Sequence, residues 1–234
     1  MTRRPRTTRS ARSSFTRALA AVALVASVVT VGALSGCSFT ASGAAGSTAP
    51  APLAEGFLSD DTTPSPEATI TPETGSWEGV RPPAGYRIVL ITAGDDAPTD
   101  NLVDGIEAWA DREDVVLERM TAADDDEVED RLNEAVATSP DLVLGAGNGV
   151  IDVFMLLTSQ HLDQQFLVVG AELPEPTANV TSVIWPGATF RGTGLGASGE
   201  VDPTTFTTER ADTAISAGVA SVLHGHTGIV LYLD

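Results

Sequence analysis

The segment "YRIVLIT", residues 86–92, is a short apolar run rich in branched side chains, and it decides the fold. Such a run is typical of a strand that is buried on both faces of a sheet. The segment that follows, "TDNLVDGIEAWADRE" (residues 99–113), has its apolar residues at helical spacing, with Thr99 or Asp100 as candidate N-caps. A strand followed at once by an amphipathic helix predicts one βα unit.

The same alternation continues through residues 84–234. We expect further strands at 114–120, 141–147, 164–170, 179–185 and 228–234, and further helices at 124–139, 149–161 and 211–226. Strands that alternate with helices form a parallel sheet covered on both faces, with right-handed crossovers. The sequence therefore predicts one three-layer α/β domain, since about 150 residues are enough for a sizeable core.

A parallel sheet of this kind binds ligands outside the carboxyl ends of its strands. The loops after the expected strands are therefore the place to look for a site. Five residues in these loops are candidate ligand-binding residues: Asp95, Asp96, Asn148, Glu172 and Trp185. If the domain binds a small solute, we expect them to line a concave pocket.

The N-terminus has the order of a secretory signal. Six arginines and no acid precede or begin the apolar run "ALAAVALVASVVTVGAL" (residues 18–34), and small residues follow it. The run is short for a membrane span, and no basic flank follows it. We therefore expect export and cleavage of residues 1–36 and not a permanent membrane helix. The signal is either that of a lipoprotein, with a role for Cys37, or a plain signal peptide in which this cysteine is incidental.

Residues 34–37, Leu-Ser-Gly-Cys, resemble the lipobox of bacterial lipoproteins, in which an aliphatic residue and two small ones precede an invariant cysteine. The resemblance implies transfer of diacylglycerol to the sulfur of Cys37, the only cysteine of the chain, and cleavage just before it. Two acyl chains at one residue hold a protein stably to a membrane. The implied location is the outer face of the bacterial cytoplasmic membrane.

The chain is strongly acidic. It has a net charge of −19 and no lysine, and removal of the six arginines in residues 1–36 takes the mature chain to −25. A surface of this charge repels nucleic acid and anionic headgroups, so we do not expect nucleic acid as a partner. With a single cysteine, the chain can form neither an intramolecular disulfide nor a cysteine-type zinc site.

Residues 37–83 are rich in Ser, Thr, Pro and Ala, and they contain few large apolar residues. Such a composition cannot bury enough surface to offset its ordering entropy. We therefore expect a disordered, semi-extended linker between the lipid anchor and the domain. Trp77 is the exception, and it is either docked on the domain or free in a loop.

Four short motifs have more than one interpretation. "GLGASG" at 194–199 matches a dinucleotide-binding pattern but does not join a strand directly to a helix, so we interpret it as a loop. "LGAGNGV" at 144–150 is either a tight turn or one edge of a small-molecule site. His224 and His226 fit a helix C-terminus better than a metal site, and the acidic run 124–130 fits a helix start better than a calcium loop. Because no nucleophile is paired with a base, we expect neither an enzyme nor a cofactor.

The segment "DLVLGAGNGVIDVFMLLTSQHLDQQFLVVGAELPEPTANVTSVIW", residues 141–185, resembles the basic-membrane-protein family of substrate-binding lipoproteins. The shared order is strand, glycine-rich turn, helix, strand, proline-bearing loop and strand. The likeness runs over residues 86–185 and resumes at 215–234. It implies the type 1 periplasmic-binding-protein fold, a lipid anchor, and delivery of nucleosides or similar solutes to an ABC permease.

The sequence departs from that family at the expected ligand positions. Family members hold their ligand between two lobes, and the resemblance here covers only the first lobe. The family's aromatic residue after the third strand falls on Asn148, and its aspartate after the fourth strand falls on Gly170. Two functions therefore stay open: solute recognition linked to an ABC importer, or an interaction lipoprotein that has kept the fold and lost the ligand.

Overall fold

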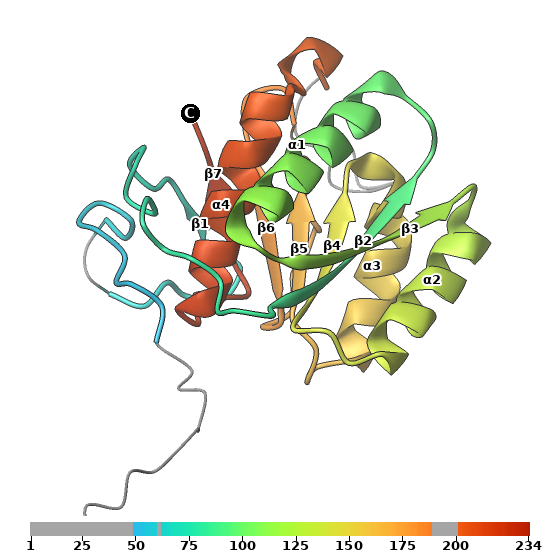
Figure 1. The fold of residues 1–234 in the computed structure, drawn as a ribbon, viewed down its shortest axis with the longest axis horizontal. Coiled ribbons are helices and arrows are strands. Elements are labelled where there is room, and N and C mark those ends of the chain that lie inside the picture. Colours follow the sequence, from blue (N-terminus) through green and yellow to red (C-terminus); the bar gives the residue numbers. More distant parts are fainter. Residues whose placement is uncertain (1–48, 60–61, 189–200) are drawn as a thin grey trace, which may run out of the picture. The chain divides into compact units, whose positions relative to one another are not determined.

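The computed structural model describes residues 49–59, 62–188 and 201–234. Within them the chain forms a seven-stranded sheet whose paired strands all run parallel, with helices on both faces (Figure 1). The elements are, in chain order, β1 (Thr69–Ile70), β2 (Arg87–Ala93), α1 (Ala97–Glu113), β3 (Val116–Ala122), α2 (Asp125–Ala137), β4 (Leu142–Ala146), η1 (Asn148–Val150), α3 (Ile151–Leu157), η2 (Thr158–Gln160), β5 (Phe166–Val169), β6 (Val180–Ile184), η3 (Pro203–Thr205), α4 (Thr208–Leu223) and β7 (Val230–Tyr232). The expected three-layer α/β class is confirmed.

The strands lie in the order β1-β7-β6-β5-β4-β2-β3. β4, β5 and β6 are buried along their whole length, and β2 is buried except at its first residue. Strands covered on both faces must be apolar on both, which is why they appear as continuous apolar runs in the sequence. β3 lies at the edge of the sheet, and its burial is correspondingly intermittent.

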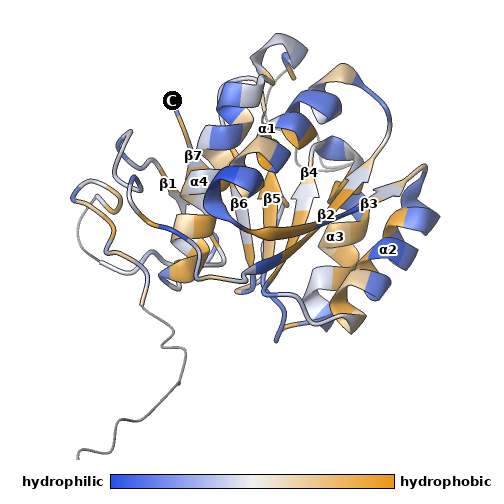
Figure 2. Cartoon of the chain, viewed as in Figure 1, coloured by the Kyte–Doolittle hydropathy of each residue, from blue (hydrophilic) through white to orange (hydrophobic). Residues whose placement is uncertain are grey.

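The helices form two layers (Figure 1). α1 and α4 cover one face, where Leu102 and Ile215 join a core cluster with Leu90 of β2. α2 and α3 cover the other face, where Leu132 and Phe154 belong to a second core cluster. Figure 2 shows apolar residues along the strands and hydrophilic residues on the outer surface of α2, as an amphipathic helix over a buried sheet requires.

The described part of the expected linker is folded, and the prediction of disorder over 37–83 is wrong there. β1 pairs with β7 in parallel, with Ile70 opposite Leu231. Phe57 and Trp77 are 1% and 6% exposed, and their rings meet edge to face with centroids 6.5 Å apart. Two aromatic anchors and a short strand therefore offset the ordering entropy of a segment that is otherwise poor in apolar residues. The domain begins well before residue 84.

The helix ends agree with the sequence in part. α1 begins at Ala97 with Asp96 as its N-cap, one turn before the expected caps, and the backbone N–H of Thr99 donates to Asp96 Oδ1 at 3.0 Å. α2 begins after its N-cap Asp124, and His224 caps the C-terminus of α4, as expected. The motif at 194–199 lies outside the described residues. Within the described ranges, no helix is long and apolar enough to span a membrane.

Candidate functional site

The strand order places a topological switch point between β2 and β4. The chain passes from β2 to β3 on one side of β2, and then returns to β4 on its other side. Where the loops after two neighbouring strands run in opposite directions, a crevice forms between them at the carboxyl end of the sheet. Open α/β folds bind ligands in this crevice. Asp95, Asp96 and Asn148 lie in the two loops that flank this switch point. The fold thus brings three of the five candidate residues to one place.

The loop after β2 is fixed by the start of α1. Asp96 uses both carboxylate oxygens, because Oδ1 accepts from the backbone N–H of Thr99 and Oδ2 accepts from the Thr99 hydroxyl, each at 3.0 Å. Asp96 is therefore committed to capping the helix. Asp95 is exposed beside it. Of these two carboxylates, Asp95 is the one that is available to a ligand.

The loop after β4 packs closely against β2. Gly147 adopts a φ of +78°, which confirms the tight turn expected for "LGAGNGV". A Cβ on Gly149 would lie 2.7 Å from the carbonyl oxygen of Ala93, so only glycine allows this approach. Among the described residues, Asn148 Oδ1 is buried and has no hydrogen-bond partner. Asn148 therefore carries an unused acceptor at the switch point.

The half of the carboxyl end above β5 and β6 is filled by the protein's own side chains. Trp185 is fully buried, its indole N–H donates to Thr205 Oγ1 at 3.1 Å, and its ring centroid lies 5.2 Å from that of Phe206. Asn101 holds this arrangement in place, since its side-chain amide donates to the carbonyl oxygen of Phe206 at 2.9 Å. Glu172 is also buried, at 2% exposure. Trp185 and Glu172 therefore do not line an open pocket with Asp95.

A shallow depression of about 440 Å³ opens beside the switch point. It is lined by Gly94, Asp95, Thr121, Ala122, Ala123 and Glu127, from the ends of β2 and β3 and the start of α2. The Glu127 side chain is oriented by the backbone, because its Oε2 accepts from Ala123 N at 2.9 Å while its own N–H donates to Asp124 Oδ1 at 3.0 Å. Sequence reasoning missed Glu127 as a lining residue, although Asp-x-x-Glu before an apolar position is a capping-box signal.

The carboxyl end of the sheet is acidic. Acids occupy the N-caps and first turns of α1, α2, η3 and α4: Asp96, Asp100, Asp124, Asp125, Asp126, Glu127, Asp202 and Glu209. The Thr204 hydroxyl and then its backbone N–H donate to Asp202 and lower the pKa of this carboxyl below its ordinary value. Arg210 lies in the first turn of α4 and donates to the carbonyl oxygen of Asp234 at 2.8 Å. A neutral or cationic ligand suits this surface better than an anion.

A second concave region lies between the N-terminal segment and the helices α1 and α4. Its central feature is Glu113, a carboxylate whose side chain is 5% exposed and which receives Arg81 Nε at 2.8 Å and Arg112 Nε at 3.0 Å. Arg112 also reaches Asp212 of α4 at 2.6 Å. The network ties residue 81 to both helices, so its role is to fasten the N-terminal segment. In the described ranges, no three His, Cys, Asp or Glu side chains are grouped to hold a metal ion.

Comparisons with known proteins concern the fold. No family model matches the sequence, and no curated protein is similar to it. A solute-binding protein of an ABC transporter from Aeropyrum pernix K1 is 17% identical over 42% of this chain and 28% of that one, with a TM-score of 0.38. A putative lipoprotein fragment from Peptoclostridium difficile 630 is 11% identical over 59% of this chain and 98% of that one, with a TM-score of 0.43. The 5-methylthioribose transporter solute-binding protein from Thermotoga lettingae TMO is 17% identical over 42% of this chain and 32% of that one, with a TM-score of 0.37.

Proposed function

We propose that this protein is a lipid-anchored extracytoplasmic binding protein of the solute-binding type that serves an ABC permease. The observation that carries the proposal is the switch point between β2 and β4, where Asp95 and Asn148 flank the place at which an α/β sheet binds small molecules. The resemblance of residues 141–185 to the basic-membrane-protein family supports a lobe of the type 1 periplasmic-binding fold. A nucleoside or a similar neutral or cationic solute fits the acidic surroundings, and catalysis is not part of the proposal.

The lipid anchor rests on residues 34–37, which lie outside the described residues. In this proposal the signal peptide is removed, Cys37 becomes the N-terminus, and its diacylglyceryl group holds the protein on the outer face of the cytoplasmic membrane. Cys37→Ser should abolish retention in the membrane fraction or block processing. Ser35→Ala keeps a small residue before the cysteine and is the matched control. Unchanged membrane retention of the Cys37→Ser protein would refute the anchor.

A thermal-shift screen of the mature chain tests solute binding. Nucleosides, sugars and amino acids are offered at high concentration, since a ligand present at 100 times its Kd stabilises the folded state by about 2.7 kcal/mol. For a domain of this size we expect a rise in Tm of about 5–10 °C, because each kcal/mol shifts Tm by about 2–4 °C. Asp95→Asn should reduce the shift, whereas Asp125→Asn, which is exposed at the start of α2 and does not line the depression, should not. No shift with any solute would refute solute binding.

A second function is favoured by one specific observation. Trp185 and Phe206 fill the carboxyl end above β5 and β6, so the open surface is a shallow depression and not a deep cleft. A surface of this form suits an interaction lipoprotein that has kept the fold and lost the ligand. If no solute stabilises the protein, cross-linking from a cysteine introduced at Asp95 should capture a protein neighbour on intact cells. Absence of any cross-link would count against this second function.

A further inference from the structure

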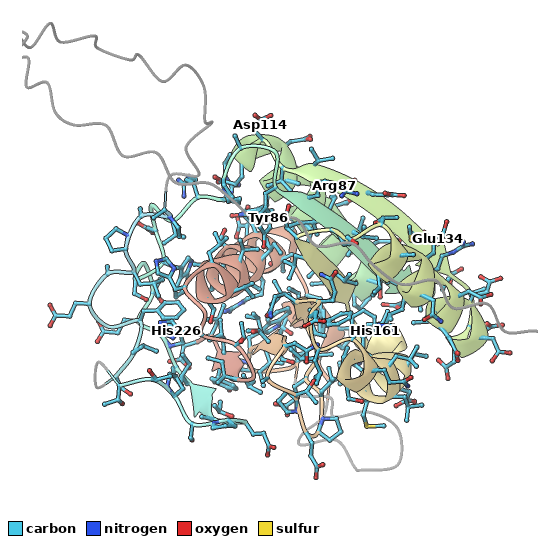
Figure 3. The ribbon with its side chains drawn as sticks, turned by 90° about the horizontal axis from the view of Figure 1, so that it is seen from below. Tyr86, Arg87, Asp114, Glu134, His161 and His226 are labelled. Carbon is cyan, nitrogen blue, oxygen red and sulfur yellow. The ribbon has the colours of Figure 1, made fainter. Side chains whose placement is uncertain are left out.

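The amino end of the sheet, where the strands begin, is the end from which the N-terminal segment leaves the domain. Phe57 stacks on His226, with ring centroids 6.3 Å apart, and His226 lies between the C-terminus of α4 and the start of β7. Residues 49–56, which precede Phe57, lie near the end of the sheet at which the strands start (Figure 1). Figure 3 views the same end directly, with Tyr86, Arg87, His161 and His226 on it.

We propose that the amino end of the sheet is the face turned toward the lipid bilayer, and that the carboxyl end faces away from it. The inference rests on the proposed lipid anchor at Cys37. Two independent features support it: the length of chain between the anchor and the domain, and the distribution of charge between the two ends.

The chain between Cys37 and residue 49 is short. Twelve residues reach at most about 43 Å, whatever conformation they adopt. α1, with 17 residues, runs from the carboxyl end to the amino end and measures about 25 Å. To bring the carboxyl end to the bilayer, the chain would have to run back alongside the domain and use more than half of its maximal reach. With the amino end toward the bilayer, no such extension is required.

The charges favour the same orientation. At the carboxyl end, the first turns of the helices present a row of acids, with Arg210 among them. An anionic bilayer repels this surface. The amino end is also acidic, with Asp114, Asp141 and Asp163 as well as Glu113, but three arginines offset part of that charge: Arg81, Arg87 and Arg112. It also carries two exposed apolar side chains, Val116 at 56% and Leu162 at 62%, which a bilayer interface tolerates.

The orientation has a consequence for the partner. A recognition surface at the carboxyl end would face the space outside the cell membrane, where a free solute or a soluble partner reaches it. Transfer of a bound solute to a membrane-embedded permease would then require the domain to turn on its tether.

Distance-dependent quenching on vesicles tests the orientation. The full chain is matured in a bacterial host and reconstituted in phosphatidylcholine–phosphatidylglycerol vesicles that carry an acceptor dye on their headgroups. Fluorophores are attached to single cysteines at the amino end (Leu162→Cys, Val116→Cys) or at the carboxyl end (Asp125→Cys, Asp202→Cys). Each introduced cysteine is the only free thiol, because Cys37 is the only native cysteine and its sulfur would carry the lipid.

We expect energy transfer from the two amino-end positions to be about twofold or more stronger than from the two carboxyl-end positions, because α1, which runs from one end of the sheet to the other, is about 25 Å long. Equal transfer, or stronger transfer from Asp125→Cys and Asp202→Cys, would overturn the orientation while leaving the lipid anchor intact. Failure of the protein to float with the vesicles would overturn the anchor, and the orientation with it.

Discussion

The carboxyl end and the amino end of the same sheet are built on different physical principles. At the carboxyl end, acidic side chains cap helices and occupy their first turns, where the helix dipole favours negative charge. At the amino end, the buried ring of Phe57 and the paired carboxylate of Glu113 fasten the N-terminal segment. The part of the carboxyl end beside β2 and β3 is therefore exposed and rich in acids, whereas packing and ion pairs hold the N-terminal segment at the amino end.

The titratable groups follow the same division. At the amino end, burial, and next the carboxylate of Asp141, raise the pKa of Tyr86 well above its ordinary value. At the carboxyl end, Asp202 is held in its charged form by hydrogen bonds from Thr204. Burial is thus the main cause of the shift at Tyr86, and hydrogen bonding is the main cause of the shift at Asp202. We expect removal of the buried Phe57 side chain to cost packing energy, and removal of the capping carboxylate of Asp96 to cost hydrogen bonds.

The largest expected effect is at the amino end. Phe57→Ala removes a side chain that is 1% exposed and contacts both Trp77 and His226, so we expect the free energy of unfolding to fall by about 3–5 kcal/mol. Denaturant unfolding of the mature chain measures it. Leu162→Ala, at a position that is 62% exposed, is the control and should change stability by less than about 0.5 kcal/mol. If the two variants behave alike, residues 49–59 are a tether and not part of the core.

A smaller effect is expected at the carboxyl end. Asp96→Ala removes the N-cap of α1 and its two hydrogen bonds to Thr99, which should cost about 1 kcal/mol, within a range of about 0.5–2. The neighbouring Asp95→Ala provides a matched control, since it removes the same charge without the cap. The difference between the two unfolding midpoints isolates the cap. An Asp95→Ala protein as unstable as Asp96→Ala would show that net charge, and not capping, governs this end.

Most of the sheet could be predicted from the sequence because its signals are local. Runs such as residues 86–92 and the helical spacing of 99–113 depend on near neighbours alone, and these elements appear close to where they were expected. β1 could not be predicted in this way. Its two residues lie in a proline- and threonine-rich stretch, and their partners Val230 and Leu231 lie about 160 residues away.

The candidate site was predicted to the level of the loops and not of the side chains. The rule for parallel sheets pointed to the loops that carry Asp95 and Asn148, and the strand order puts these loops beside the switch point. Whether an aromatic side chain at a strand end is exposed or buried depends on residues that are far away in the sequence. Trp185 is covered by Phe206, which lies 21 positions further on. The role of Asp96 as a cap depends on where α1 starts, and Pro98 in the first turn is the sequence signal that could have placed that start.

The smallest effect tests the packed nature of the amino end through pH. Burial, and next the neighbouring charge of His224, lower the pKa of His226 below its ordinary value of about 6.5. The unfolded chain then binds a proton at this residue more readily than the folded protein does. Above about pH 6.5, His226 should not change the free energy of unfolding. As the pH drops from 6.5 toward the pKa of His226 in the folded protein, the free energy of unfolding should fall. Below that pKa, His226 should cause no further loss.

Urea midpoints measured between pH 8 and pH 5 for the wild type and for His226→Gln isolate this contribution. His226→Gln should flatten the slope below pH 6.5, whereas Leu162→Ala, a change without a titratable group on the same end of the sheet, should leave it unchanged. Equal slopes for the wild type and His226→Gln would show that the stacked ring beneath Phe57 takes up a proton as freely in the folded protein as in the unfolded chain. The amino end would then be as open to water at that position as the carboxyl end is at Asp95.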